Sequence, residues 1–158
     1  MKHLPKHLRP RYRYLGVELR ADPDAGVDRG TFRRHLRYAA QNLVGDAGSA
    51  ELRLEVLGFE FVDGEGYAVV RCRRGTVDRA RAVLACLDAV DGERVRAVVR
   101  GVSGTVRGCE EKYIRRPGGV SEERTVAFAD ADRRAVVRED GLSVRVGSSY
   151  VGATHLDT

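Results

Sequence analysis

The stretch "ELRLEVLGFEFVDGEGYAVVRC", Glu51–Cys72, contains two strand-like runs in succession. The runs "ELRLEVLGFEFV" and "GYAVVRC" are rich in the apolar, β-branched and aromatic residues that strands favour. Between them lies Asp63-Gly64-Glu65-Gly66, whose glycines suit the positive backbone angles of a hairpin turn. The stretch therefore predicts an antiparallel β-hairpin in the middle of the chain.

Upstream of the hairpin, the sequence predicts one strand and one helix. "RYRYLGVELR", Arg11–Arg20, alternates apolar and polar residues as a strand does. Asp28 is the expected N-cap of the helix, and Gly45 ends the helical pattern. The apolar face of this helix consists of Phe32, Leu36, Ala40 and Leu43. Its other side carries a basic stripe that faces either phosphate or solvent, namely Arg29, Arg33 and Arg37.

Downstream of the hairpin, a second helix and a fourth strand are expected. Thr76 caps this helix, which ends at the turn Asp91-Gly92, and "RVRAVVRGVSG", Arg94–Gly104, then alternates as a strand. A third helix runs from about Thr105 to Arg116. The order βαββαβ predicts an α+β, ferredoxin-like sandwich like that of the RNA-recognition motif, with an extra C-terminal helix. The sheet face away from the first two helices either binds a ligand or is covered by the third helix.

The chain divides into three expected segments. Residues 1–12 form a basic N-terminal arm, residues 13–116 form the α+β domain, and residues 117–158 form a C-terminal extension that either packs on the domain or stays loose. In the extension, "RTVAF", "AVV" and "LSVRV" read as short strands. No apolar run approaches the ~20 residues of a membrane span, so a soluble, cytoplasmic protein without membrane partners is expected. Three cysteines without a CxxC pair favour free thiols over a disulfide framework.

The net charge is concentrated at the N-terminus. Residues 1–20 hold six lysines or arginines against one acidic residue, which accounts for the whole net charge of +5. Pro5 and Pro10 discourage a helix there. Such an arm suits the electrostatic capture of a polyanion such as nucleic acid, although a solvated terminus remains the alternative.

No protein catalytic centre or metal site is expected from the residues. Glu110 and Glu111 are adjacent, so on a helix they diverge by about 100° and cannot serve as a facing acid and base. Cys109 has no neighbouring histidine and reads as a small buried residue. His3 and His7 have a helical metal-ligand spacing, but the proline between them argues against a helix.

RNA binding is the better interpretation of the polar residues. "GYAVVRC" is similar to the third-strand consensus of the RNA-recognition motif, and Tyr67 and Tyr14 would stack on bases. Val69 occupies the place of a second stacking ring, so plain packing of the tyrosines is the alternative. The cluster of Arg71, Arg73 and Arg74 suits phosphate contact more than base reading.

Three segments together resemble one known family. "RYRYLGVEL", "GYAVVRCRRG" and above all "VRGVSGTVRGCEEKYIRR" resemble ribonuclease P protein component 2 of archaea, a family shared with the eukaryotic ribonuclease P/MRP small protein subunit. The similarity covers about residues 9–116. Its specific part is Val102–Glu111, and the tail from Pro117 onward has no counterpart in the short versions of the family.

The resemblance implies a ribonucleoprotein role. In this family an RNA subunit with magnesium removes the 5′ leader of precursor tRNA, so the resemblance implies no cofactor on the protein itself. The implied partners are ribonuclease P RNA, precursor tRNA, the TIM-barrel subunit component 3 and other ribonuclease P proteins, with a possible heterotetramer. The candidate RNA-binding residues are Arg9, Arg11, Arg13, Tyr14, Tyr67, Arg71, Arg73, Arg74, Ser103, Gly104, Thr105 and Arg107.

Two alternatives remain open at this point. The chain could be an independent single-stranded RNA-binding domain that works through Tyr67. It could also be a nuclease in its own right, a reading supported only by Cys109 and the neighbouring carboxylates. For the Ser103-Gly104-Thr105 join, a plain capped turn and a direct RNA contact are equally supported.

Overall fold

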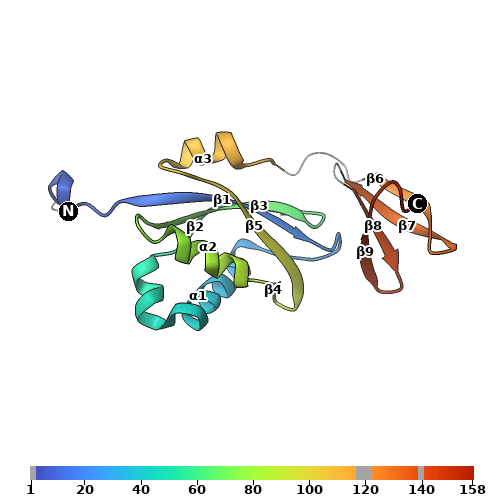
Figure 1. Ribbon diagram of the computed structural model, residues 1–158, viewed down its shortest axis with the longest axis horizontal. Helices are drawn as coiled ribbons and strands as arrows, with labels where there is room; N and C mark the ends of the chain where they lie inside the picture. Colours follow the sequence, from blue (N-terminus) through green and yellow to red (C-terminus); the bar gives the residue numbers. More distant parts are fainter. Residues whose placement is uncertain (1–2, 117–121, 139–140) are drawn as a thin grey trace.

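The computed structural model describes residues 3–116, 122–138 and 141–158. In these residues two antiparallel sheets follow one another along the chain (Figure 1). The elements are η1 (Lys6–Leu8), β1 (Tyr12–Ala21), α1 (Arg29–Leu52), β2 (Glu55–Val62), β3 (Glu65–Arg73), α2 (Val77–Cys86), β4 (Ala89–Val90), β5 (Glu93–Ser103), α3 (Val106–Tyr113), β6 (Glu122–Phe128), β7 (Ala131–Arg138), β8 (Gly141–Val146) and β9 (Ser149–Ala153).

The first sheet has the strand order β2-β3-β1-β5-β4. β1 lies in the middle and pairs antiparallel with both β3 and β5, so the two βαβ halves interlock. With α1 and α2 on one face, this is the ferredoxin-like fold, and the predicted α+β class is confirmed (Figure 1). α2 ends at Cys86 and not at the Asp91-Gly92 turn as predicted, and the short strand β4, which pairs with the start of β5, lies between them.

The main core lies between this sheet and the two helices. Every second residue of β1 points into it, and Leu15, Val17 and Leu19 are fully buried. Phe32 and Leu36 from α1 meet them from the other layer, and Phe32 packs on Phe59 of β2 with ring centroids 5.4 Å apart. The helical spacing seen in the sequence thus corresponds to a real buried face, except that Leu43 is exposed.

The predicted hairpin is present, but its first strand starts later than expected. β2 and β3 pair antiparallel from Glu55↔Arg71 to Val62↔Glu65. Glu51 and Leu52 belong to the end of α1 and not to a strand. The apolar alternation misled the prediction here because Leu52 is buried as part of the helix.

α1 begins as predicted and ends differently. The Asp28 carboxylate accepts a hydrogen bond from Thr31 N over 3.0 Å, which confirms it as the N-cap. Gly45 was expected to end the helix, and it does end the first helical segment. Its φ of 72° breaks the helical backbone, but a second helical segment resumes and continues to Leu52.

Thr76 does not cap α2 through its side chain. Its hydroxyl instead donates to Arg73 O over 2.7 Å, which ties the start of the helix back to the end of β3. Thr76 is also buried, so this bond satisfies a polar group inside the fold.

The third helix covers part of the sheet face opposite α1 and α2, which we call the open face (Figure 1). Gly16 on β1 and Gly101 on β5 lie beneath Tyr113 of α3. A Cβ added to Gly16 would lie 2.7 Å from the Cβ of Tyr113, so only glycine lets the helix approach so closely. Of the two possibilities for this face, cover by the third helix is therefore observed.

The C-terminal extension contains the second sheet, in the order β6-β7-β8-β9. Three of its strands fall on the runs identified in the sequence, and β9 was missed. Ala135, Leu142 and Val144 form a small core of their own. Arg138 joins this sheet to the β2–β3 hairpin: its guanidinium donates to Ala21 O and Asp63 O, both over 3.2 Å, and pairs with Glu65.

Candidate nucleic-acid interface

The N-terminal arm enters the sheet beside the end of β3. Arg9 Nε donates to Leu4 O over 2.8 Å, and Arg74 N donates to Arg11 O over 2.8 Å. The second bond extends the antiparallel ladder by one step, because Tyr12 and Arg73 are already paired residues. The sheet therefore fixes the point at which the arm leaves the domain.

A cleft of about 390 Å³ lies where the arm, the end of β3 and the end of α1 meet. Five arginines and one histidine line it, and none of its described lining residues is acidic. The lining consists of His7, Leu8, Arg9, Pro10, Arg11, Arg53, Arg73 and Arg74. We call this site the basic cleft.

The arginines of the basic cleft are electrostatically uncompensated. Across residues 3–116, 122–138 and 141–158, none of the five forms an ion pair. Arg73 acts on Glu51 through its charge, but Glu51 is hydrogen-bonded to Arg79, which is the main reason why its pKa is lowered. Like charges held close together repel one another, and a polyanion relieves that repulsion.

The structure brings four predicted residues together in this cleft, namely Arg9, Arg11, Arg73 and Arg74. Sequence reasoning missed Arg53 and assigned no RNA-binding role to His7. Arg53 occupies the left-handed region at the C-cap of α1 (φ 48°, ψ 47°), which turns the chain from the helix toward β2. In the sequence it lies inside an apparent strand, so no local signal marks it.

Arg71 is placed differently from Arg73 and Arg74. Its side chain lies over the Tyr12 ring, with 4.2 Å from the guanidinium carbon to the ring centroid, and it forms an ion pair with Glu55. Its charge is thus already engaged within the domain.

The Ser103-Gly104-Thr105 join is a capped turn with one arginine beside it. Thr105 Oγ1 accepts from Gly108 N over 3.0 Å and caps α3, and Ser103 Oγ accepts from Thr105 N over 3.4 Å. Gly104 is exposed, and a Cβ on it would lie 3.9 Å from Arg13 Nη1. Arg13 and the turn therefore adjoin at the end of the sheet where the arm enters.

Arg107 is exposed on α3. It pairs with Glu111 one turn later, over 2.7 Å, as an i,i+4 pair. Such an exposed pair contributes little to stability and leaves the guanidinium accessible.

The two predicted stacking tyrosines lie on the open face. Tyr14 is paired with Ser103 and Tyr67 with Glu18, so they occupy different parts of the sheet. Burial, followed by the nearby charge of Glu60, raises the pKa of Tyr67. An acidic neighbour and the cover by α3 make this face a poor platform for single-stranded RNA.

Cys109 is a packing residue, as expected. Its side chain is fully buried against Gly16, and burial raises the pKa of its thiol to about 11. Glu110 and Glu111 are exposed on the same helix. A buried thiol with a raised pKa is a poor nucleophile, so Cys109 lends no support to the nuclease interpretation.

The part of the chain that the structure describes contains no group of three or more His, Cys, Asp or Glu side chains arranged to hold a metal ion. None of its helices is long and apolar enough to cross a membrane.

Comparison with known proteins identifies full-length relatives. Ribonuclease P protein component 2 of Natronomonas pharaonis is 64% identical over 157 residues, covering 99% of this chain and 98% of the relative. That of Halorubrum lacusprofundi is 58% identical over 158 residues, covering 100% and 99%. These relatives thus extend over the C-terminal sheet as well. Ribonuclease P protein component 2 of Methanosarcina acetivorans is 36% identical over 115 residues, covering 73% of this chain and 83% of the relative.

A family model completes the assignment, and one solved structure is also similar. A chain in the cryo-EM structure of yeast ribonuclease MRP aligns with a TM-score of 0.46 and 17% identity, covering 60% of this chain and 75% of that chain. The model of the Rpp14/Pop5 family matches residues 13–114, which is most of the first domain. The resemblance inferred from the sequence segments is confirmed: the chain belongs to the Rpp14/Pop5 family.

Proposed function

We propose that this chain is a protein subunit of ribonuclease P and binds structured RNA through the basic cleft. The observation that carries the RNA-binding part is the convergence of five arginines, free of ion pairs in the described residues, where the arm meets the sheet. Guanidinium groups suit phosphate because they donate two parallel hydrogen bonds to it. The names of the full-length relatives support the assignment to ribonuclease P.

The contacts of the cleft are to phosphates rather than to bases. Arginines that contact phosphates fix the position of an RNA but do not read its sequence. Arg13 and the Ser103-Gly104-Thr105 turn extend the cleft toward α3 and contact the same RNA. The protein therefore recognises the folded shape of its RNA.

Phosphodiester cleavage is carried by the RNA subunit with its magnesium, and this chain supplies binding and positioning. Cys109, the one candidate nucleophile that the sequence offered, is buried and protonated, which supports this division. The free thiols fit a reducing compartment such as the cytoplasm.

From the family resemblance we also expect precursor tRNA and component 3 as partners, and a possible heterotetramer. Light scattering of co-expressed subunits measures their stoichiometry, and a persistent monomer would contradict the heterotetramer.

The test compares two double variants of the full chain that remove equal charge. Arg73→Gln with Arg74→Gln removes two charges from the basic cleft. Arg81→Gln with Arg94→Gln removes two exposed arginines elsewhere that have no ion pair in the described residues. Binding to transcribed ribonuclease P RNA is measured over a range of salt concentrations. The cleft variant should reduce the magnitude of the negative slope of log K against log salt by about 1.4 to 1.8, because each lost phosphate contact removes about 0.7 to 0.9.

Two outcomes would contradict the proposal. One is an equal slope for the cleft variant and the control, which would remove the basic cleft from RNA binding. The other is cleavage of precursor tRNA by the purified chain without RNA, abolished by Cys109→Ser, which would return catalysis to the protein.

A further inference from the structure

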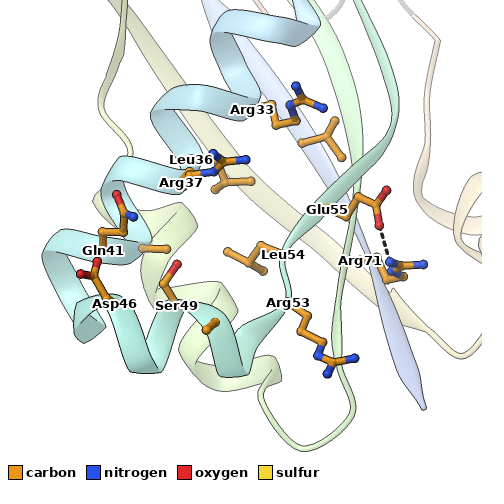
Figure 2. Close-up of a pocket in the computed structure, with 13 residues that line it drawn as sticks. Arg33, Leu36, Arg37, Gln41, Asp46, Ser49, Arg53, Leu54, Glu55 and Arg71 are labelled. Carbon is orange, nitrogen blue, oxygen red and sulfur yellow. Dashed lines mark hydrogen bonds and ion pairs between the residues drawn. The ribbon is translucent and has the colours of Figure 1, made fainter. Parts of the chain in front are cut away.

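A groove lies between α1 and β2 (Figure 2). It adjoins the basic cleft, because both are lined by Arg53. Its volume is about 540 Å³, within the range of roughly 300–1,000 Å³ typical of small-molecule sites. The lining residues are Arg33, Leu36, Arg37, Ala40, Gln41, Asp46, Ser49, Ala50, Arg53, Leu54, Glu55, Val56 and Arg71. We call it the α1–β2 groove.

The break in α1 creates this groove. Gly45 has a φ of 72°, so the helix changes direction there before it resumes. Gln41 lines the groove from the first segment, whereas Asp46 and Ser49 line it from the second (Figure 2). An unbroken helix would not enclose the space in this way, because its two ends would lie on one straight axis.

The groove has an apolar floor and a basic rim. Leu36, Ala40 and Val56 lie beneath the groove and are at least 98% buried. The half-buried Leu54 supplies the apolar surface of the floor. Arg33 and Arg37 rise from the exposed side of α1 and have no ion pair in the described ranges. Of the two acidic lining residues, Glu55 is already paired with Arg71 (Figure 2).

The three arginines of the basic stripe seen in the sequence therefore have two different roles. Arg29 is structural, because its guanidinium donates to Val56 O at the edge of the sheet over 2.6 Å. Arg33 and Arg37, one and two turns further along, line the groove instead. The guanidinium groups of Arg33 and Arg37 therefore lie at the rim without an ion pair among the described residues.

The groove and the basic cleft share Arg53. One guanidinium thus borders both spaces, so the groove opens beside the arginines of the basic cleft. Continuity with a cleft lined by arginines favours RNA as the occupant over an acidic peptide, because a nucleic-acid strand supplies regularly spaced charges along its whole length.

We propose that the α1–β2 groove is a second RNA-contact site, which receives an unpaired nucleotide of the strand whose phosphates lie in the basic cleft. The base packs on the apolar floor, and Arg33 and Arg37 contact the flanking phosphates or stack on the base. Arg53 connects the two sites. The inference rests on the proposed function, because it assumes that the basic cleft binds ribonuclease P RNA.

The first test uses charge-matched variants. Arg33→Gln with Arg37→Gln should reduce the magnitude of the negative salt slope for ribonuclease P RNA by about 1.4, whereas the Arg81 and Arg94 control should leave it unchanged. Circular dichroism and thermal unfolding verify that both variants fold. If the cleft variant is impaired and the groove variant equals the control, this inference fails while the proposed function stands. If neither is impaired, both fail.

The second test maps position. In a Cys86→Ser background, which removes the exposed native thiol, single cysteines at Leu8, Ser49 and Ala85 carry a tethered iron chelate that generates hydroxyl radicals. Cleavage from Leu8→Cys and Ser49→Cys should fall on one RNA strand within a few nucleotides, and Ala85→Cys on exposed α2 should give none. The inference is overturned if Ser49→Cys cleaves nothing, or if the groove variant loses another protein subunit while its RNA binding is unchanged.

Discussion

At the scale of single residues, burial separates the three thiols. Cys72 and Cys109 are fully buried, and burial raises the pKa of both, in the case of Cys109 from an ordinary 9.0 to about 11. Cys86 is exposed on α2. Because the thiolate is the reactive form, a raised pKa means that ionisation is delayed to higher pH.

Iodoacetamide should therefore alkylate Cys86 alone in the native protein. At pH 9 an ordinary thiol is half ionised, whereas the thiolate fraction of Cys109 is about fiftyfold smaller. Its burial also shields Cys109 from the reagent. Mass spectrometry of the labelled chain measures the result: one adduct in buffer and three in denaturant. Rapid labelling of native Cys109 would show that α3 opens readily.

The candidate site was predictable where charge alone was the signal. Arg9, Arg11, Arg73 and Arg74 form recognisable basic clusters along the chain, so their convergence in one cleft required only the correct pairing of β1 with β3. Arg53 was not predictable. Its contribution depends on a left-handed backbone conformation at the end of α1, which the alternating pattern around it conceals.

At the scale of elements, the sequence predicted the order of strands and helices better than their limits. The Asp63-Gly64 turn and the alternation of β1 are local signals, and both were correct. The helical segment that follows Gly45 has no local signal in the sequence. Glycine there signals the end of a helix equally well, and only the packing of Leu52 into the core decides that a second segment follows.

The close approach of α3 to the open face gives an element-scale prediction. Gly16→Ala should destabilise the fold by about 1–3 kcal/mol, because the new Cβ would lie 2.7 Å from the Cβ of Tyr113 and would push α3 away. Thermal unfolding measures the change. Gly26→Ala is the matched control, since a Cβ there meets nothing within 4 Å and should be neutral or slightly stabilising. Equal melting temperatures would mean that α3 is not held against the sheet.

At the scale of the whole molecule, the two ends of the first sheet have different neighbours. The basic arm lies at one end, and the C-terminal sheet lies beside the β2–β3 turn at the other (Figure 1). This placement could not be predicted from the sequence. The alternating pattern predicts the strands of the C-terminal sheet. The contact that joins this sheet to the first one is made by Arg138, and nothing in the sequence distinguishes Arg138 from the other 24 arginines.

Arg138→Gln should release the C-terminal sheet from the domain. The side chain is 9% exposed and contacts Ala21 O, Asp63 O and the Glu65 carboxylate, so its loss should weaken docking by about 1.5–3 kcal/mol, the range for hydrogen bonds to charged groups. Hydrogen exchange followed by mass spectrometry should show faster exchange in the β2–β3 turn. Arg134→Gln on the exposed side of β7 is the control.

RNA affinity should be unchanged in both variants, because the basic cleft lies at the opposite end of the sheet. A loss of affinity in Arg138→Gln alone would instead show that the C-terminal sheet belongs to the RNA-binding surface.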